Sequence, residues 1–142
     1  MWVVVHTYVG LALASMLHVP FWQMVVVVLA SHVLLDPVPH WDYTGDRGRI
    51  LLGSADILAA LNTVIALLVL GLPFATVALG VISGLPDLDV ASDAITGRKT
   101  GHHLFPSHWQ RFPHGQCGPT LGIPLQLVIV VTCAVVVVTV GL

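Results

Sequence analysis

The stretch SHVLLDPVPHWDY, positions 31 to 43, places two imidazoles and two carboxylates where an apolar run ends. His32 and Asp36 are four positions apart, so they share one face of a helix. His40 and Asp42 follow directly, after the two prolines of PVP. Imidazole nitrogen and carboxylate oxygen together suit zinc, manganese or iron. We therefore interpret this stretch as half of a metal site.

Ionisable residues also occur in the other apolar runs, at a similar depth. His6 lies inside the first run, Asp56 lies inside the third, and Asp87 and Asp89 follow the fourth in GLPDLD. Each has a simpler explanation alone, such as a hydrogen bond of His6 to a neighbouring helix or a favourable helix-dipole position for Asp56. Ionisable groups inside a membrane cost several kcal/mol unless they are paired or ligated. Their convergence at one level therefore predicts a metal-binding site.

The composition places the chain in the membrane class. It has 142 residues, of which 56% are hydrophobic and 8% charged, with a mean hydropathy of +0.94. Apolar runs with so little polar alternation predict helices rather than strands. We expect an all-α fold, an integral membrane bundle of about five helices that forms a single domain over residues 1–142, with a long loop before the last helix. The apolar runs cover 2–17, 21–36, 50–72, 74–85 and 120–142.

The basic residues predict an orientation for this bundle. A serpentine path places the N-terminus, the 37–49 loop and the 86–119 loop on one side. All five Lys and Arg residues belong to that side, which the positive-inside rule makes cytoplasmic. The prediction is a cytoplasmic N-terminus and an external C-terminus. The five basic residues are Arg47, Arg49, Arg98, Lys99 and Arg111.

Composition also narrows the chemistry. The net charge of −2 gives no reason to expect a nucleic-acid partner. Cys117 and Cys133 match no zinc or redox spacing, which excludes a thiolate site. A divalent metal with His and Asp ligands is expected, zinc in the first place and manganese or iron as alternatives. Such a set fits a one- or two-metal hydrolytic centre, in which the metal lowers the pKa of a bound water.

Four motifs together resemble a known family. They are VHTYVG in the first run, SHVLLDPVPHWD after the second, SAD in the third and GLPDLD after the fourth. The pattern is similar to the membrane-bound metal-dependent hydrolase family, which includes LexA-regulated hydrolases of the bacterial inner membrane. Its H-x3-D-x2-P-H element also resembles the zinc-dependent phospholipase C and single-strand nuclease superfamily. The resemblance implies a hydrolase of the bacterial inner membrane that acts on a phosphoester or another lipid-like substrate.

Carried over by position, the resemblance also implies roles for individual residues. Two carboxylates would have catalytic roles, either by hydrogen bonding to the metal ligands or by activating the bound water, namely Asp42 and Asp89. The family's HRGxTHS-like segment is not retained in the 86–119 loop, where His108 and His114 are either its counterpart or interfacial residues. The implied metal ligands are His6, His32, Asp36, His40, Asp56 and Asp87.

A second function stays open at this stage. A chain of 142 residues leaves little room for a substrate pocket outside the bilayer. It could therefore be a small non-catalytic membrane subunit, or a structural component of a larger membrane complex. Membrane lipid, other membrane protein chains or a second copy of the chain would be its partners. The 86–119 loop would then bind a partner, whereas in an enzyme it would cover the metal site. An open coordination position that faces a cavity would favour the enzyme.

Overall fold

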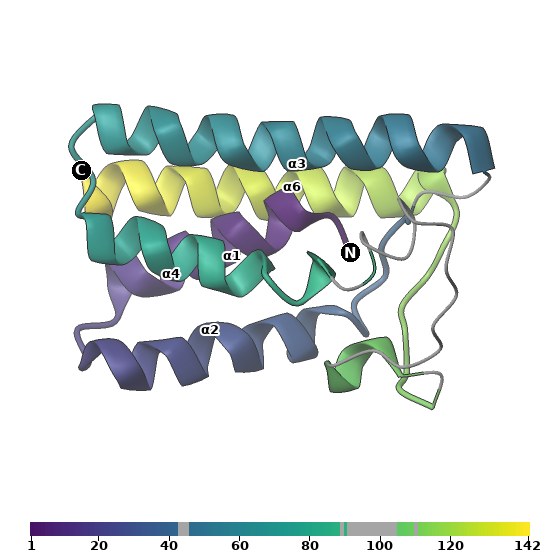
Figure 1. The fold of residues 1–142 in the computed structure, drawn as a ribbon, viewed down its shortest axis with the longest axis horizontal. Coiled ribbons are helices and arrows are strands. Elements are labelled where there is room, and N and C mark those ends of the chain that lie inside the picture. Colours follow the sequence, from purple (N-terminus) through teal and green to yellow (C-terminus); the bar gives the residue numbers. More distant parts are fainter. Residues whose placement is uncertain (43–45, 89, 91–104, 110) are drawn as a thin grey trace.

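The computed structural model describes residues 1–42, 46–88, 90, 105–109 and 111–142, with the backbone alone described for 46–49. Within these residues the chain is helical and contains no β-strand, which confirms the all-α class for the described part (Figure 1). The elements are α1 (Val3–Met16), α2 (Phe21–Leu35), α3 (Asp46–Val69), α4 (Phe74–Gly84), the 3₁₀ turn η1 (Pro106–His108), α6 (Pro119–Val136) and its π-helical continuation η2 (Val137–Gly141).

The helix starts follow local sequence signals. Proline precedes α2 and α4 at Pro20 and Pro73, and α6 begins at Pro119. Proline suits these positions because its fixed φ matches a helix start and its missing N–H is not needed in the first turn. Two helices begin before the apolar runs that predict them. Helix α3 starts at Asp46 rather than at Ile50, and α6 starts at Pro119 rather than at Thr120. An apolar run marks the buried or lipid-facing part of a helix, and not its polar first turn.

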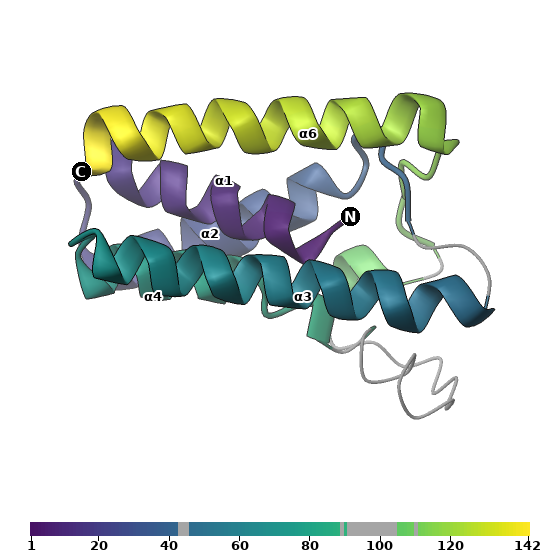
Figure 2. The same ribbon diagram turned by 90° about the horizontal axis from the view of Figure 1, so that it is seen from above.

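Helix α1 is the centre of the bundle. It packs against α2, α3, α4 and α6, and Figure 2 shows it between α6 on one side and α3 and α4 on the other. Its contact with α4 is close because small residues line it. A Cβ atom at Gly10 would lie 2.5 Å from Ser83 Cβ, and one at Gly80 would lie 2.6 Å from Leu11 Cγ. Small residues allow helix axes to approach closely without a large apolar interface.

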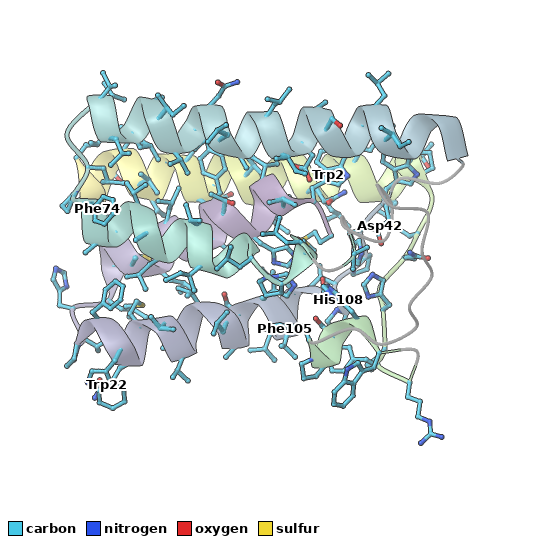
Figure 3. The ribbon with its side chains drawn as sticks, viewed as in Figure 1. Trp2, Trp22, Asp42, Phe74, Phe105 and His108 are labelled. Atoms are coloured by element: carbon cyan, nitrogen blue, oxygen red, sulfur yellow. The ribbon has the colours of Figure 1, made fainter. Side chains whose placement is uncertain are left out.

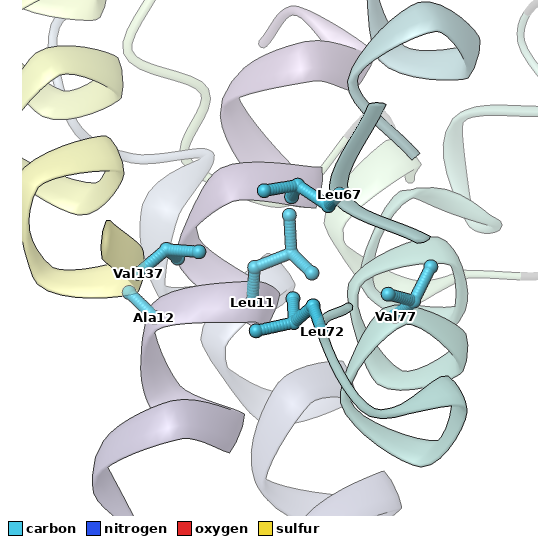
Figure 4. Close-up of a cluster of buried hydrophobic side chains, with 6 residues drawn as sticks. All are labelled: Leu11, Ala12, Leu67, Leu72, Val77 and Val137. Carbon is cyan, nitrogen blue, oxygen red and sulfur yellow. The ribbon is translucent and has the colours of Figure 1, made fainter. Parts of the chain in front are cut away.

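A buried apolar cluster lies near the turn between α3 and α4, close to the C-terminus (Figure 4). The outer surfaces of α3 and α6 are also apolar. Two helical stretches, Ile50–Val69 and Pro119–Gly141, are long and apolar enough to cross a membrane, and only 17% and 11% of them are buried. By length and composition this is a limited indication of membrane association. The buried cluster consists of Leu11, Ala12, Leu67, Leu72, Val77 and Val137.

The two ends of the bundle differ in character. The start of α1, the segment after α2 and η1 lie at one end, whereas the α1–α2 turn, the α3–α4 turn and the C-terminus lie at the other. Figure 3 shows Trp2, Asp42 and His108 at the first end, and Trp22 and Phe74 at the opposite end. This is the arrangement that the serpentine path predicts. The orientation of the bundle relative to a membrane remains a prediction.

Candidate metal centre

Five ionisable side chains meet at the polar end of the bundle, and we call them the central cluster. Helix α1 supplies His6, α2 supplies His32, and the residues beyond α2 and α4 supply Asp36 and Asp87. The fifth member, His108, ends η1. At most 9% of any of these side chains is exposed. Four separate parts of the fold therefore bring donor atoms into one buried site.

The two carboxylates divide the three imidazoles into two sets. His6 Nε2 lies 3.4 Å from Asp36 Oδ1 and 3.8 Å from Asp87 Oδ2. The other oxygens of the same carboxylates, Asp36 Oδ2 and Asp87 Oδ1, lie 3.6 and 3.7 Å from His32 Nε2. They also lie 3.8 and 3.4 Å from His108 Nε2. Each carboxylate thus directs one oxygen to each set, as a carboxylate does when it bridges two ions.

These separations are longer than hydrogen bonds, which join nitrogen and oxygen at about 2.7–3.2 Å. Atoms held about 2.0–2.1 Å from a tetrahedral zinc ion lie roughly 3.3–3.4 Å from one another. Five buried atoms of the central cluster have no hydrogen-bond partner among the described residues: His6 Nδ1, His6 Nε2, His32 Nε2, Asp36 Oδ2 and Asp87 Oδ2. Buried polar atoms normally have a partner. The donor set therefore fits a bound cation.

The tautomer of His32 supports the same conclusion. Its Nδ1 lies 2.8 Å from the carbonyl oxygen of Ser83, which can only accept, so Nδ1 carries the proton. In the neutral ring Nε2 then presents a lone pair to Asp36 and Asp87, whose ionised oxygens are also acceptors. Atoms of this kind repel unless a proton or a cation lies between them. Histidines that bind metals typically donate their other ring nitrogen to a carbonyl in this way.

The surroundings of the central cluster favour the ionised form of its two carboxylates. Burial by itself would raise the pKa of Asp36, but the adjacent His6 lowers this pKa well below its usual range. Burial opposes ionisation at Asp87 too, and His6 and His108 lower the pKa of that carboxyl. Buried charges are stable only when compensating charges lie beside them. The α-ammonium group of Met1 lies 3.5 Å from Asp36 Oδ1 and supplies one such charge. A divalent cation would compensate both carboxylates at once.

A second group, the outer cluster, consists of His40, Asp42 and His114. Asp42 Oδ2 lies 3.2 Å from His40 Nε2 and 3.1 Å from His114 Nε2, and the two nitrogens are 3.3 Å apart. Gln116 Nε2 donates to the same oxygen at 2.9 Å. Burial by itself would raise the pKa of Asp42, but the adjacent His114 and His40 hold this pKa below its usual range. The outer cluster shares no residue with the central cluster.

Backbone pairing joins the two segments that carry the outer cluster. Gly115 N donates to Asp36 O, and His40 N donates to Gly115 O, both at 2.8 Å. A Cβ atom at Gly115 would lie 2.3 Å from Val38 O and 2.4 Å from Pro37 O. Backbone carbonyls cannot move aside as a flexible side chain can, so this approach requires glycine.

The structure brings together four of the six predicted ligands, namely His6, His32, Asp36 and Asp87. His40 instead belongs to the outer cluster, together with Asp42, for which a water-activating role was predicted. Asp89, the second predicted catalytic residue, lies outside the described residues.

Asp56 has a different position from the one predicted for a ligand. Its Oδ2 accepts the backbone N–H of Val3 at 2.7 Å, and its Oδ1 accepts that of Val4 at 3.0 Å. The first N–H groups of a helix have no partner within the helix, so a carboxylate there acts as a cap. Asp56 thus caps α1 from the neighbouring helix α3, and the central cluster forms without it.

Sequence reasoning gave no definite role to His108 and His114, which complete the two clusters. The sequence did show several histidines in the 86–119 loop. It could not show that η1 packs against α2, because that contact depends on the tertiary fold. Gln126 is a buried polar residue of α6 that sequence reasoning gave no site role. Its Nε2 donates to Gly122 O at 3.3 Å and to Trp41 O at 3.1 Å, and its Oε1 accepts the backbone N–H of Trp2 at 3.1 Å. It therefore holds α6 against both segments that lead to the clusters.

Comparison of the chain with protein-family models, with curated proteins and with solved structures gave no match.

Proposed function

We propose that the protein is a metal-dependent hydrolase embedded in a membrane, and that the central cluster would hold two divalent ions, one beside His6 and one beside His32 and His108. The observation that carries the proposal is the unequal supply of ligand atoms to the two positions. His32, His108 and one oxygen of each carboxylate supply four atoms to one position. Among the described side chains, His6 and the two remaining carboxylate oxygens supply three to the other.

This difference matches the distinction between structural and catalytic zinc. Structural ions have four protein ligands, whereas catalytic ions have three and keep a fourth position for water or substrate. An ion at the His6 position would lower the pKa of a coordinated water and polarise a phosphoryl or acyl oxygen. Asp36 and Asp87 hold the two positions together, and the Ser83 carbonyl fixes the orientation of His32. Zinc suits this donor set best, and manganese and iron accept the same ligands.

The substrate class is inferred from the position of the cluster in the bundle. The outer faces of α3 and α6 expose large apolar side chains, such as Leu51, Val69, Val128 and Val131. Apolar patches of this extent are rare on soluble monomers. The cluster lies at the C-terminal ends of α2 and α4 and in the first turn of α1, and we infer that this is the level of the lipid headgroups. A phosphoester of an amphiphilic molecule would reach the cluster there. The distribution of basic residues favours the cytoplasmic face of a bacterial inner membrane for this end of the bundle.

Hydrolysis of a defined substrate by metal-loaded protein tests the proposal. The full-length chain is reconstituted in phosphatidylcholine vesicles with zinc, and release of the headgroup is measured on a short-chain phospholipid and on a chromogenic phosphodiester. We expect turnover that is lost on chelation and in His6→Ala. His18→Ala, which changes an exposed histidine at the opposite end, is the matched control and stays active. Folded protein that binds zinc but hydrolyses neither substrate class would contradict the proposal.

Complete burial of His6, His32 and Asp36 favours a second candidate, a non-catalytic membrane subunit with a structural metal. The two candidates differ in whether water reaches the ion. Mn²⁺ bound to the protein relaxes the protons of bulk water strongly only if a coordinated water exchanges with solvent. Strong relaxation that disappears in His6→Ala supports the hydrolase. Weak relaxation with bound Mn²⁺ supports the structural subunit.

A further inference from the structure

We propose that the outer cluster is a second, independent metal site, in which a divalent ion bound by His40, Asp42 and His114 fastens the segment after η1 to the segment after α2. This inference goes beyond the proposed hydrolase, because it concerns different residues and holds whether or not the central cluster turns over a substrate.

The three closest donor atoms of the outer cluster have too few protons for every pair of them to form a hydrogen bond. His40 Nε2, His114 Nε2 and Asp42 Oδ2 form a triangle with sides of 3.1, 3.2 and 3.3 Å. A hydrogen bond along each side needs one proton on that side, and the ionised oxygen carries none. Each nitrogen can contribute one proton at most. Three sides therefore share at most two protons, and hydrogen bonding alone leaves one side repulsive.

The tautomer of His40 makes this conflict sharper. His40 Nδ1 lies 2.7 Å from Val38 O, which can only accept, so the Nδ1 proton is committed there. In the neutral ring, His40 Nε2 then directs a lone pair at the Asp42 oxygen 3.2 Å away. A cation at the centre of the triangle removes the repulsion on every side. The sides also agree with the roughly 3.3–3.4 Å between ligand atoms around a tetrahedral zinc ion.

The surroundings hold these atoms in place and leave a path for an ion. His40 is fully buried, whereas 23% of the Asp42 side chain and 29% of the His114 side chain are exposed. Gln116 donates to Asp42 and limits the rotation of its carboxylate. The backbone of Gly115 bonds on both sides to the segment after α2. A preorganised donor set with partial exposure is what a site that loads from solution requires.

A consequence for the central cluster follows from the chain connection. His108 ends η1, and His114 lies six residues further along in the segment that follows η1. An ion that fixes His114 to His40 and Asp42 therefore limits where His108 can lie. The outer ion would act as a positioning element for the His108 side of the central cluster.

Metal content measured on full-length protein in detergent, after loading with Zn²⁺ and removal of free ion, tests the inference. We expect His114→Ala to bind about one ion fewer than the wild type, and His32→Ala to retain about one ion. Asp42→Asn, which keeps the shape of the side chain, should show the same loss as His114→Ala, so the result does not depend on the folding of a single variant. The helical circular dichroism of each variant is compared with that of the wild type.

The outcomes separate this inference from the proposed function. If His114→Ala and Asp42→Asn bind as many ions as the wild type, or if folded His32→Ala binds none, the separate outer site is wrong. If the wild type binds one ion and His114→Ala removes it, the outer site stands and the hydrolase proposal fails. Spectra of Co²⁺-loaded His32→Ala add an independent readout, because tetrahedral coordination in the outer site gives intense visible absorption that His114→Ala should abolish.

Discussion

The central and outer clusters use the same residue types but are built in different ways. In the central cluster, helices and their ends supply buried donors, and the closest imidazole–carboxylate distances are 3.4–3.8 Å. In the outer cluster, two non-helical segments supply three donors at 3.1–3.3 Å, of which Asp42 and His114 are partly exposed, and backbone pairing at Gly115 holds the segments together. A helix bundle can fix ligands by packing alone, whereas a loop site depends on local hydrogen bonds. The two sites should therefore fail under different substitutions.

The largest effect is expected for Asp36→Ala, because each oxygen of this carboxylate belongs to one of the two ligand sets. We expect loss of both central ions. The fall in hydrolysis should exceed the roughly 10–100-fold loss that is typical when a residue that only hydrogen-bonds to a metal ligand is changed. The matched control is Asp42→Asn, which removes a carboxylate of the outer cluster and should leave the central ions bound. Zinc content by elemental mass spectrometry checks both. An Asp36→Ala protein that retains the wild-type number of ions would contradict the shared-carboxylate arrangement.

Gly115→Ala should break the outer cluster while leaving the helices intact. The added Cβ would lie 2.3 Å from Val38 O, and relief of such a clash typically costs about 1–3 kcal/mol. We expect lower stability in chemical denaturation and loss of the outer ion. Gly118→Ala is the control on the same segment, because its Cβ would meet only Thr120 Oγ1, at 3.9 Å. Equal stability of the two variants would mean that the segment does not pack as described.

Asp56→Ala separates helix capping from metal binding. Loss of the two hydrogen bonds to the start of α1 should lower the free energy of unfolding by about 0.5–2 kcal/mol. The number of bound ions should not change, since the central cluster forms without Asp56. Thermal unfolding and metal content are measured on the same sample. Loss of an ion in this variant would restore the ligand role that the sequence predicted for Asp56.

The smallest effect is expected for Gln116→Ala. This change removes one hydrogen bond to Asp42 Oδ2, which is worth about 0.5–1.5 kcal/mol. The affinity of the outer site for Zn²⁺ should fall by that amount, while the affinity of the central cluster is unchanged. Competition with a chelator of known affinity measures both. A fall in the central affinity alone would reverse the assignment of Gln116 to the outer site.

Sequence reasoning predicted the helices well because long apolar runs have few other solutions, and it placed His6, His32, Asp36 and Asp87 at one level because helical rise converts position into depth. It could not assign Asp56, whose partners are backbone N–H groups of another helix and leave no trace in residue type. It also could not decide the roles of His108 and His114. The positions of these two histidines depend on close backbone contacts at Gly115 and Gly122. A Cβ atom added at either glycine would lie 2.3 Å from a neighbouring backbone atom.

The central claim is that the cluster of His6, His32, Asp36, Asp87 and His108 binds divalent metal. Elemental mass spectrometry of detergent-purified protein is the most direct test. Three proteins are compared: the wild type, a double variant that carries both His32→Ala and Asp36→Ala, and the control His18→Ala. We expect bound zinc, manganese or iron in the wild type and in the control, and loss of the central ions in the double variant. Wild-type protein that is folded and free of metal after loading, or a double variant with undiminished metal content, would contradict it.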